Sequence, residues 1–211
     1  METFEESGAN ASRTKILYHI HTPSTARPEL EVGEVYNTGT QSNRFWGFYE
    51  GDYVRCGIPQ YDGLYAAQAL YDHINSALIS EPELNIKLLN FAAVATRELG
   101  MMLRELVFEE VRREMFPEKP SRRTSLFVCS GVALPFWMTW FNVDQRSKYI
   151  FSLECTGEFH SGSQRFLDSD SMGYNEYRKN AIEYWASEEI TGKVNIEILF
   201  SGTFRVLARV E

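Results

Sequence analysis

A single carboxylate stands among apolar residues near the end of the chain. Glu197 follows Ile196 and precedes the apolar residues 198–200. Burying a carboxylate costs free energy unless the group has a partner or a catalytic task. No basic residue lies beside Glu197 in the sequence. The pattern therefore indicates a catalytic carboxylate, and the simpler interpretation is a glutamate at a strand end that reaches water.

Two histidines lie close together near the start of the chain. His19 and His21 are two residues apart in an apolar stretch, so on a strand both side chains point to one face. This geometry suits two ligands of one metal ion, with a third ligand from His160, Asp168 or Asp170, but no spacing selects one of these three. We therefore predict no metal site. We expect one histidine to make a functional hydrogen bond, and two purely structural histidines remain the alternative.

Two arginines precede a strand predicted at residues 124–129. The planar fork of Arg122 or Arg123 suits a phosphate or a carboxylate. With Arg112, Arg113 and Lys119 they form the only basic cluster in a chain of net charge -8. The sequence thus predicts a site for a phosphate-bearing ligand here. The alternative is surface charge paired with Glu114 or Glu118.

Other constellations exclude or leave open further classes of chemistry. Glu154 and Glu197 have the residue type of a glycosidase pair, but their separation cannot be read from the sequence. The chain has no glycine-rich phosphate loop, no Ser-His-Asp order and no His-Glu-x-x-His motif, so Rossmann-type NAD binding finds no support.

Cys56, Cys129 and Cys155 form no Cys-x-x-Cys motif, and we expect buried free thiols in a reducing compartment.

Composition indicates one globular domain. The 211 residues are 44% hydrophobic and 14% aromatic, which is enough for a core. The net charge of -8 argues against nonspecific attraction to nucleic acid or to anionic membranes, so a nucleic-acid substrate would need a local basic patch. No targeting or membrane-spanning pattern is present, and we expect a soluble, cytoplasmic protein.

The first half of the chain is predicted to be rich in helix. Residues 1–13 read as a flexible lead-in, and residues 14–211 as the domain. The elements expected before residue 80 are a strand at 15–21, a loop to about residue 40, an aromatic run at 43–50 and a helix at 64–78. The aromatic run fits a strand or a ligand-lining loop, where it would stack a base or join the core.

A long helix is predicted from residue 80 to residues 115–117. Ser80, Pro82 and Glu83 form a capping box at its start. An amphipathic stripe follows, and Gly100 is expected to weaken the helix midway. The stripe consists of Leu84, Leu88, Ala92, Ala95, Leu99, Met102, Leu106 and Val111. Glu109 and Arg113 have the spacing of an i,i+4 ion pair on its solvated face.

The second half of the chain is predicted to be rich in strand. The elements expected there are strands at 124–129, 149–156, 194–200 and 203–210, and helices at 133–140 and 174–185. We expect Pro135 to break the first of these helices, residues 157–172 to form a loop, and Ser201 with Gly202 to turn a hairpin. The fold class is therefore α+β, with a mostly antiparallel sheet and with helices concentrated in the first half.

Several segments together resemble a known family. Residues 109–117, 120–122 and 125–129, with 43–50 and 181–185, are similar to a bacterial and phage family of domains of unknown function in the ADP-ribosyltransferase-like superfamily. The similarity spans roughly residues 15–210. It implies a single ADP-ribosyltransferase-like domain with a split sheet. The best-understood relatives are RNA-modifying toxins of toxin–antitoxin–chaperone phage-defence systems, so antitoxin and chaperone partners are implied as well.

The resemblance assigns roles to individual residues. Glu197 takes the place of the catalytic glutamate, and Asn195, two residues earlier, favours the histidine-type class. His19, with His21 as its rival, takes the place of the histidine that binds the adenosine ribose of NAD. The Pro-Ser-Arg triplet at 120–122 implies that Ser121 and Arg122 contact the pyrophosphate.

The tyrosine that stacks on nicotinamide in the superfamily is missing here. Leu126, Phe127 and Val128 stand where Ile-Tyr-Phe is expected, so Phe127, Trp137 or Trp140 must replace it. The resemblance implies a mono-ADP-ribosyltransferase that consumes NAD and modifies RNA. The alternatives are an NAD glycohydrolase, with water as acceptor, and a catalytically silent module that binds NAD or nucleic acid.

Overall fold

The computed structural model describes residues 13–23, 29–43, 46, 50, 71–72, 82–141, 148–167, 172–187 and 193–210. The chain divides into two compact units, and each is described by itself. Unit 1 comprises residues 1–41, 118–163 and 187–211, and unit 2 comprises 42–117 and 164–186. Residues 1–12 and most of the helix predicted at 64–78 lie outside the described residues. In the aromatic run, Trp46 and Glu50 are helical, which differs from the predicted strand or loop.

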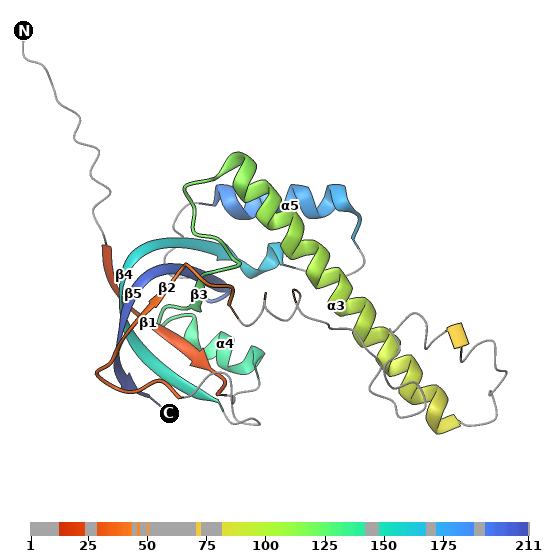
Figure 1. The fold of residues 1–211 in the computed structure, drawn as a ribbon, viewed down its shortest axis with the longest axis horizontal. Helices are drawn as coiled ribbons and strands as arrows, with labels where there is room; N and C mark the ends of the chain where they lie inside the picture. The colour runs from red at the N-terminus through yellow and green to blue at the C-terminus, as the bar shows by residue number, and fades with distance from the viewer. Residues whose placement is uncertain are drawn as a thin grey trace, which may run out of the picture. The chain divides into compact units, whose positions relative to one another are not determined.

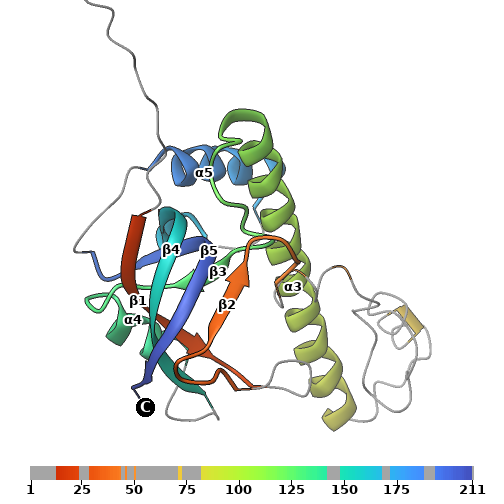
Figure 2. The same cartoon turned by 60° about the vertical axis from the view of Figure 1, so that its left-hand side comes forward.

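Unit 1 holds an antiparallel five-stranded sheet (Figure 1). Its strands are β1 (Arg13–His21), β2 (Val35–Thr38), β3 (Leu126–Val128), β4 (Tyr149–Ser163) and β5 (Ile196–Arg209). Figure 2 shows β1, β4, β5 and β2 following one another across the sheet, and β3 also pairs with β5. A backbone bridge between Tyr18 and Cys129 returns the pairing from the end of β3 to β1. The two N···O distances of this bridge are both 2.9 Å.

One hydrophobic core cluster of unit 1 lies on a single face of these strands. Alternate residues of β5 point to it, because side chains alternate between faces along a strand. The buried members of the core are Leu17, Val128, Phe151, Leu153, Cys155, Ile196, Ile198, Phe200, Phe204 and Val206. Glu197, between two core residues, consequently projects from the opposite face.

The hairpin predicted at residues 194–210 is wrong, because β5 runs through Ser201 and Gly202 without turning. Gly202 lies opposite Gly157 of β4, and both have positive φ, at 149° and 156°. A Cβ at Gly157 would lie 2.3 Å from the Ser201 carbonyl oxygen, and one at Gly202 would lie 2.4 Å from that of Thr156. Glycine therefore serves a close approach of two strands here, not a turn.

Three other strand predictions differ from the structure. β4 continues through residues 157–163, which were predicted as loop, and the short 3-10 helix η3 (Gln164–Phe166) follows it. Buried Ser161 and Ser163 lie opposite Ile198 and Ile196, so small polar residues here mark a covered strand. β2 lies inside the loop predicted to end near residue 40. Strand β3 is only three residues long.

The helices of the described chain are α3 (Pro82–Met115), α4 (Leu134–Trp140) and α5 (Tyr174–Ala186). They are not concentrated in the first half, because α4 and α5 follow residue 133 and α3 crosses the middle of the chain. The α+β class and the antiparallel sheet are confirmed. Pro135 lies in the first turn of α4 and begins the helix instead of breaking it. No helix in the described ranges is long and apolar enough to cross a membrane.

Unit 2 packs α3 against α5. The Trp185 indole Nε1 donates a hydrogen bond to the Phe108 carbonyl oxygen at 2.8 Å, and both side chains are fully buried. The buried face of α3 differs from the predicted stripe, since Leu99 and Leu106 are 47% and 48% exposed. Leu88, Ala95 and Val111 of the predicted stripe are buried, and the residues buried with them outside the stripe include Arg104, Glu105, Val107 and Phe108. Glu109 pairs with Arg112 at 2.8 Å, not with Arg113 as predicted.

The described cysteines are free and buried, which confirms the prediction for Cys129 and Cys155; Cys56 lies outside the described residues. Burial raises the pKa of both thiols to about 12. Only about one thiol in 10⁴ is then a thiolate at pH 8, so both should resist alkylation. In a Cys56→Ser background, we expect no label from iodoacetamide in the native protein and two labels after denaturation. Native labelling at the rate of a free thiol would contradict this expectation.

Candidate functional site

The centre of the candidate site is a buried ion pair in unit 1. Glu197, the second residue of β5, is 8% exposed, and Arg122 is 2% exposed. The Arg122 Nη1 donates a hydrogen bond to the Glu197 Oε1. The Arg122 guanidinium also lies over the Phe127 ring, 5.3 Å from its centroid. A carboxylate, a guanidinium and an aromatic ring are thus brought together.

A tight turn before β3 presents Arg122. The backbone N–H groups of Thr124 and Ser125 donate to the Ser121 carbonyl oxygen at 3.2 and 2.9 Å. The Ser121 hydroxyl accepts a hydrogen bond from the Arg123 N–H at 3.1 Å. Arg122 points inward from this turn, whereas Arg123 is exposed. Ser121 therefore shapes the turn that carries the arginine.

The predicted surface pairing of this arginine segment is not what the structure shows. Arg122 pairs with Glu197, while Glu114 pairs with Arg178 of α5 at 2.7 Å. Arg112 is held by Glu109. Two members of the basic cluster, Arg112 and Arg122, are therefore held in separate ion pairs.

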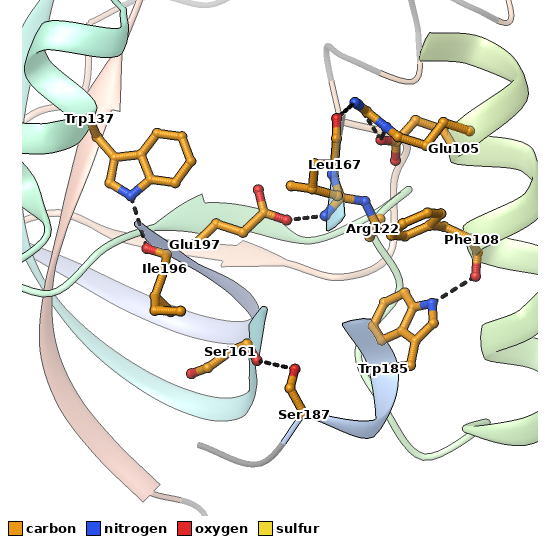
Figure 3. A network of polar contacts seen from close by, with 11 residues as sticks. Glu105, Phe108, Arg122, Trp137, Ser161, Leu167, Trp185, Ser187, Ile196 and Glu197 are labelled. Carbon is orange, nitrogen blue, oxygen red and sulfur yellow. Dashed lines mark hydrogen bonds and ion pairs between the residues drawn. The ribbon is translucent and has the colours of Figure 1, made fainter. Parts of the chain in front are cut away.

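Two tryptophans lie on α4. The Trp137 Nε1 donates to the Ile196 carbonyl oxygen at 2.9 Å, which fixes the buried indole beside the backbone of Glu197. Figure 3 shows the Glu197 side chain between Trp137 and Arg122. Trp140 is 53% exposed and stacks on Phe136, with ring centroids 6.0 Å apart. Trp137 is therefore placed closer to the carboxylate strand than Trp140.

The two histidines lie together but project from the other face of the strands. His19 and His21 share the face of Leu17 and Phe151, whereas Glu197 projects opposite to that face. The His19 Nδ1 donates to the Phe127 carbonyl oxygen at 2.9 Å. His21 is buried, and its ring lies 5.7 Å from that of His19. His19 thus contacts the backbone of the strand that carries Phe127.

The structure also bears on the two alternative kinds of site, a metal site and a glycosidase pair. No group of three His, Cys, Asp or Glu side chains among the described residues is arranged to hold a metal ion, and Asp168 and Asp170 lie outside those residues. Glu154 is exposed and lies opposite Arg205, eight residues along β4 from Gly162, the partner of Glu197. The interpretation of Glu154 and Glu197 as a glycosidase pair is therefore wrong.

His160 is a buried polar residue on the face of Glu197 to which the sequence pattern assigns no role except that of a candidate metal ligand. His160 is 3% exposed and lies opposite Leu199, while Glu197 lies opposite Gly162. Residues directly opposite one another in an antiparallel pair point to the same side, so His160 and Glu197 share a face. The prediction of a loop at 157–172 concealed this placement. Residues 157–163 hold one large apolar residue, Phe159, so they carry no alternating pattern that would predict a strand.

A family model described as protein of unknown function DUF2441 matches residues 17–211. No curated protein matches the chain.

Proposed function

The chain belongs to the DUF2441 family, and we propose that it transfers ADP-ribose from NAD to an acceptor, with RNA as the acceptor class. The observation that carries this proposal is the buried Glu197 carboxylate, bonded to Arg122 and placed near the aromatic residues Phe127 and Trp137. The proposed reaction takes place in the cytoplasm. The antitoxin and chaperone partners that the resemblance implies belong to the same proposal.

The proposed reaction requires the protein mainly to stabilise a positive charge and to position the reactants. The bond between nicotinamide and ribose breaks, and its electron pair leaves with nicotinamide. The ribose carbon becomes oxocarbenium-like, and a carboxylate close to it stabilises the positive charge. A hydroxyl or ring nitrogen of the acceptor then forms the new bond and loses its proton to solvent. We assign the stabilising charge to Glu197.

The surrounding residues have distinct proposed roles. Phe127 or Trp137 takes the place of the missing tyrosine and stacks on nicotinamide. Trp140 offers an exposed ring further along α4. Arg122 forms an ion pair with Glu197. We therefore propose that Arg122 orients this carboxylate and does not contact the pyrophosphate. Ser121 supports the turn that carries Arg122.

His19 projects from the face opposite to Glu197, so we propose that it affects NAD binding more than the chemical step, through the Phe127 carbonyl oxygen that it holds. The loss of a hydrogen bond with a partner that stays buried costs about 1–3 kcal/mol, or roughly a tenfold to hundredfold change in affinity. We expect His19→Ala to raise the KM for NAD about tenfold with a smaller change in kcat, and His21→Ala to raise it less. Steady-state kinetics on both variants test this. A larger KM effect in His21→Ala would exchange the two roles.

A second candidate is favoured by the same ion pair. A carboxylate that is neutralised by Arg122 needs no catalytic task to explain its burial. The chain would then be a silent module that binds NAD or nucleic acid. An NAD glycohydrolase, in which water accepts the ribose, uses the same site and differs only in the acceptor.

One experiment separates the three functions. The full chain is incubated with NAD labelled in its adenine, in separate reactions with pools of RNA, DNA and protein, and free nicotinamide is measured in each. Label in RNA supports the proposed transferase. Nicotinamide release without label supports the glycohydrolase, and silence in both readouts supports the binding module. Label only in DNA or in protein would overturn the choice of RNA as acceptor.

A further inference from the structure

An apolar row on α3 faces solvent. Leu89, Leu99, Leu103 and Leu106 are 69%, 47%, 39% and 48% exposed. The row is completed by Ala92, which is half-buried, and Thr96, which is exposed. We call these six residues the α3 seam. Their spacings alternate between three and four residues, which is the a/d pattern of a two-helix coiled coil.

The α3 seam is complementary to itself when it is reversed. In an antiparallel pair centred between residues 97 and 98, Leu89 lies opposite Leu106 of the second copy and Ala92 opposite Leu103. Thr96 then lies opposite Leu99. A small residue faces a large one in both inner layers, and two leucines meet at each end. A two-fold interface requires this reciprocity, since each contact must occur twice.

Charge is excluded from the α3 seam and from the residues beside it. The flanking positions hold Ala93, Ala95, Gly100 and Met102, which are small or uncharged. The charged residues at the centre of the row, Arg97 and Glu98, project from the other side of the helix by the 3.6-residue period. Along the α3 seam a second copy therefore meets no like charge, although the chain carries a net charge of -8. Ala93, which is exposed, and Gly100 are small and allow two helices to approach closely.

We propose that the α3 seam is a homodimer interface, in which two copies of α3 pack antiparallel about a two-fold axis near residues 97 and 98. The seam covers 18 residues, or about 27 Å of helix. A contact of that length buries on the order of 1,000 Å² in total, which is the lower end for a specific interface. The dimer is therefore concentration-dependent. This inference does not depend on the proposed enzymatic function.

Cysteine cross-linking tests the register and the direction of the helices. Ala92→Cys and Leu103→Cys are made separately in the full chain with Cys56→Ser, and are oxidised alone and as a mixture. In the antiparallel dimer the two sites face each other, whereas like sites are separated by about 16 Å along the axis, beyond disulfide reach. We expect a cross-linked dimer only in the mixture. A cross-linked dimer in either variant alone would overturn the proposal. The absence of a cross-linked dimer from all three preparations would also overturn it.

Sedimentation tests the interface without cysteines. Leu103→Glu places two charges in the dimer seam, and we expect it to raise the dimer dissociation constant about 100-fold or more. Val94→Glu is the matched control, because Val94 is 57% exposed on the same helix but lies outside the seam. We expect this control to sediment as wild type does. A wild-type chain that stays monomeric, or equal loss of dimer in both variants, would refute the interface.

Discussion

Replacing Glu197 with Gln is expected to lower ADP-ribosyl transfer by about 10²–10³-fold, the typical cost of losing one preorganised electrostatic group. Gln keeps the shape and one hydrogen-bonding oxygen but removes the negative charge that the oxocarbenium-like ribose requires. The variant also leaves the buried Arg122 without its counter-charge, so its melting temperature should fall. Transfer rate is therefore measured at a temperature where circular dichroism shows both proteins folded.

The matched control is Glu154→Gln. Glu154 is an exposed carboxylate on β4, and strand register places it far from Glu197. The same change of charge there should leave both transfer and melting temperature near wild type. A loss of transfer in the Glu154 variant that equals the loss in the Glu197 variant would reject Glu197 as the catalytic carboxylate.

The elements with strong local signals could be predicted from the sequence. The helix expected from residue 80 to residues 115–117 is α3, and the helix expected at 174–185 is α5. The strand expected at 15–21 is β1. Their patterns of apolar residues, caps and breakers are local properties of the chain. The strand pair β4–β5 was harder to predict. Gly157 and Gly202 resemble turn residues, and only the opposite strand shows that they permit a close approach.

The parts of the candidate site could be singled out, but their pairing could not. Glu197 stood out as a lone carboxylate in an apolar strand, and Arg122 as a fork beside a strand. These residues are 75 positions apart, and antiparallel pairing of β3 with β5 is what brings their segments together. The same limit applies to His19, whose contact with the Phe127 carbonyl oxygen crosses 108 positions. The sequence gives the residue types directly, whereas the contacts between side chains on different strands depend on the strand register.

The ion pair itself gives the second large expected effect, on stability. Arg122→Ala should lower the free energy of unfolding by about 3–5 kcal/mol, because it leaves the buried Glu197 carboxylate without a partner. Arg122→Lys should lower it less, since a point charge remains but the planar fork is lost. Urea unfolding at pH 7 measures both. Arg123→Ala, the exposed neighbour on the same turn, is the control and should change the value by no more than about 0.5 kcal/mol.

A double-mutant cycle decides whether that cost comes from the uncompensated charge. Adding Glu197→Gln to Arg122→Ala removes the orphaned carboxylate, so the double variant should be more stable than Arg122→Ala alone. This sign is opposite to that for two independent destabilising changes. If the two losses simply add, the arginine stabilises the turn at residues 121–125 and not the carboxylate. Arg122 would then lose its assignment as the residue that holds Glu197 in place for the reaction.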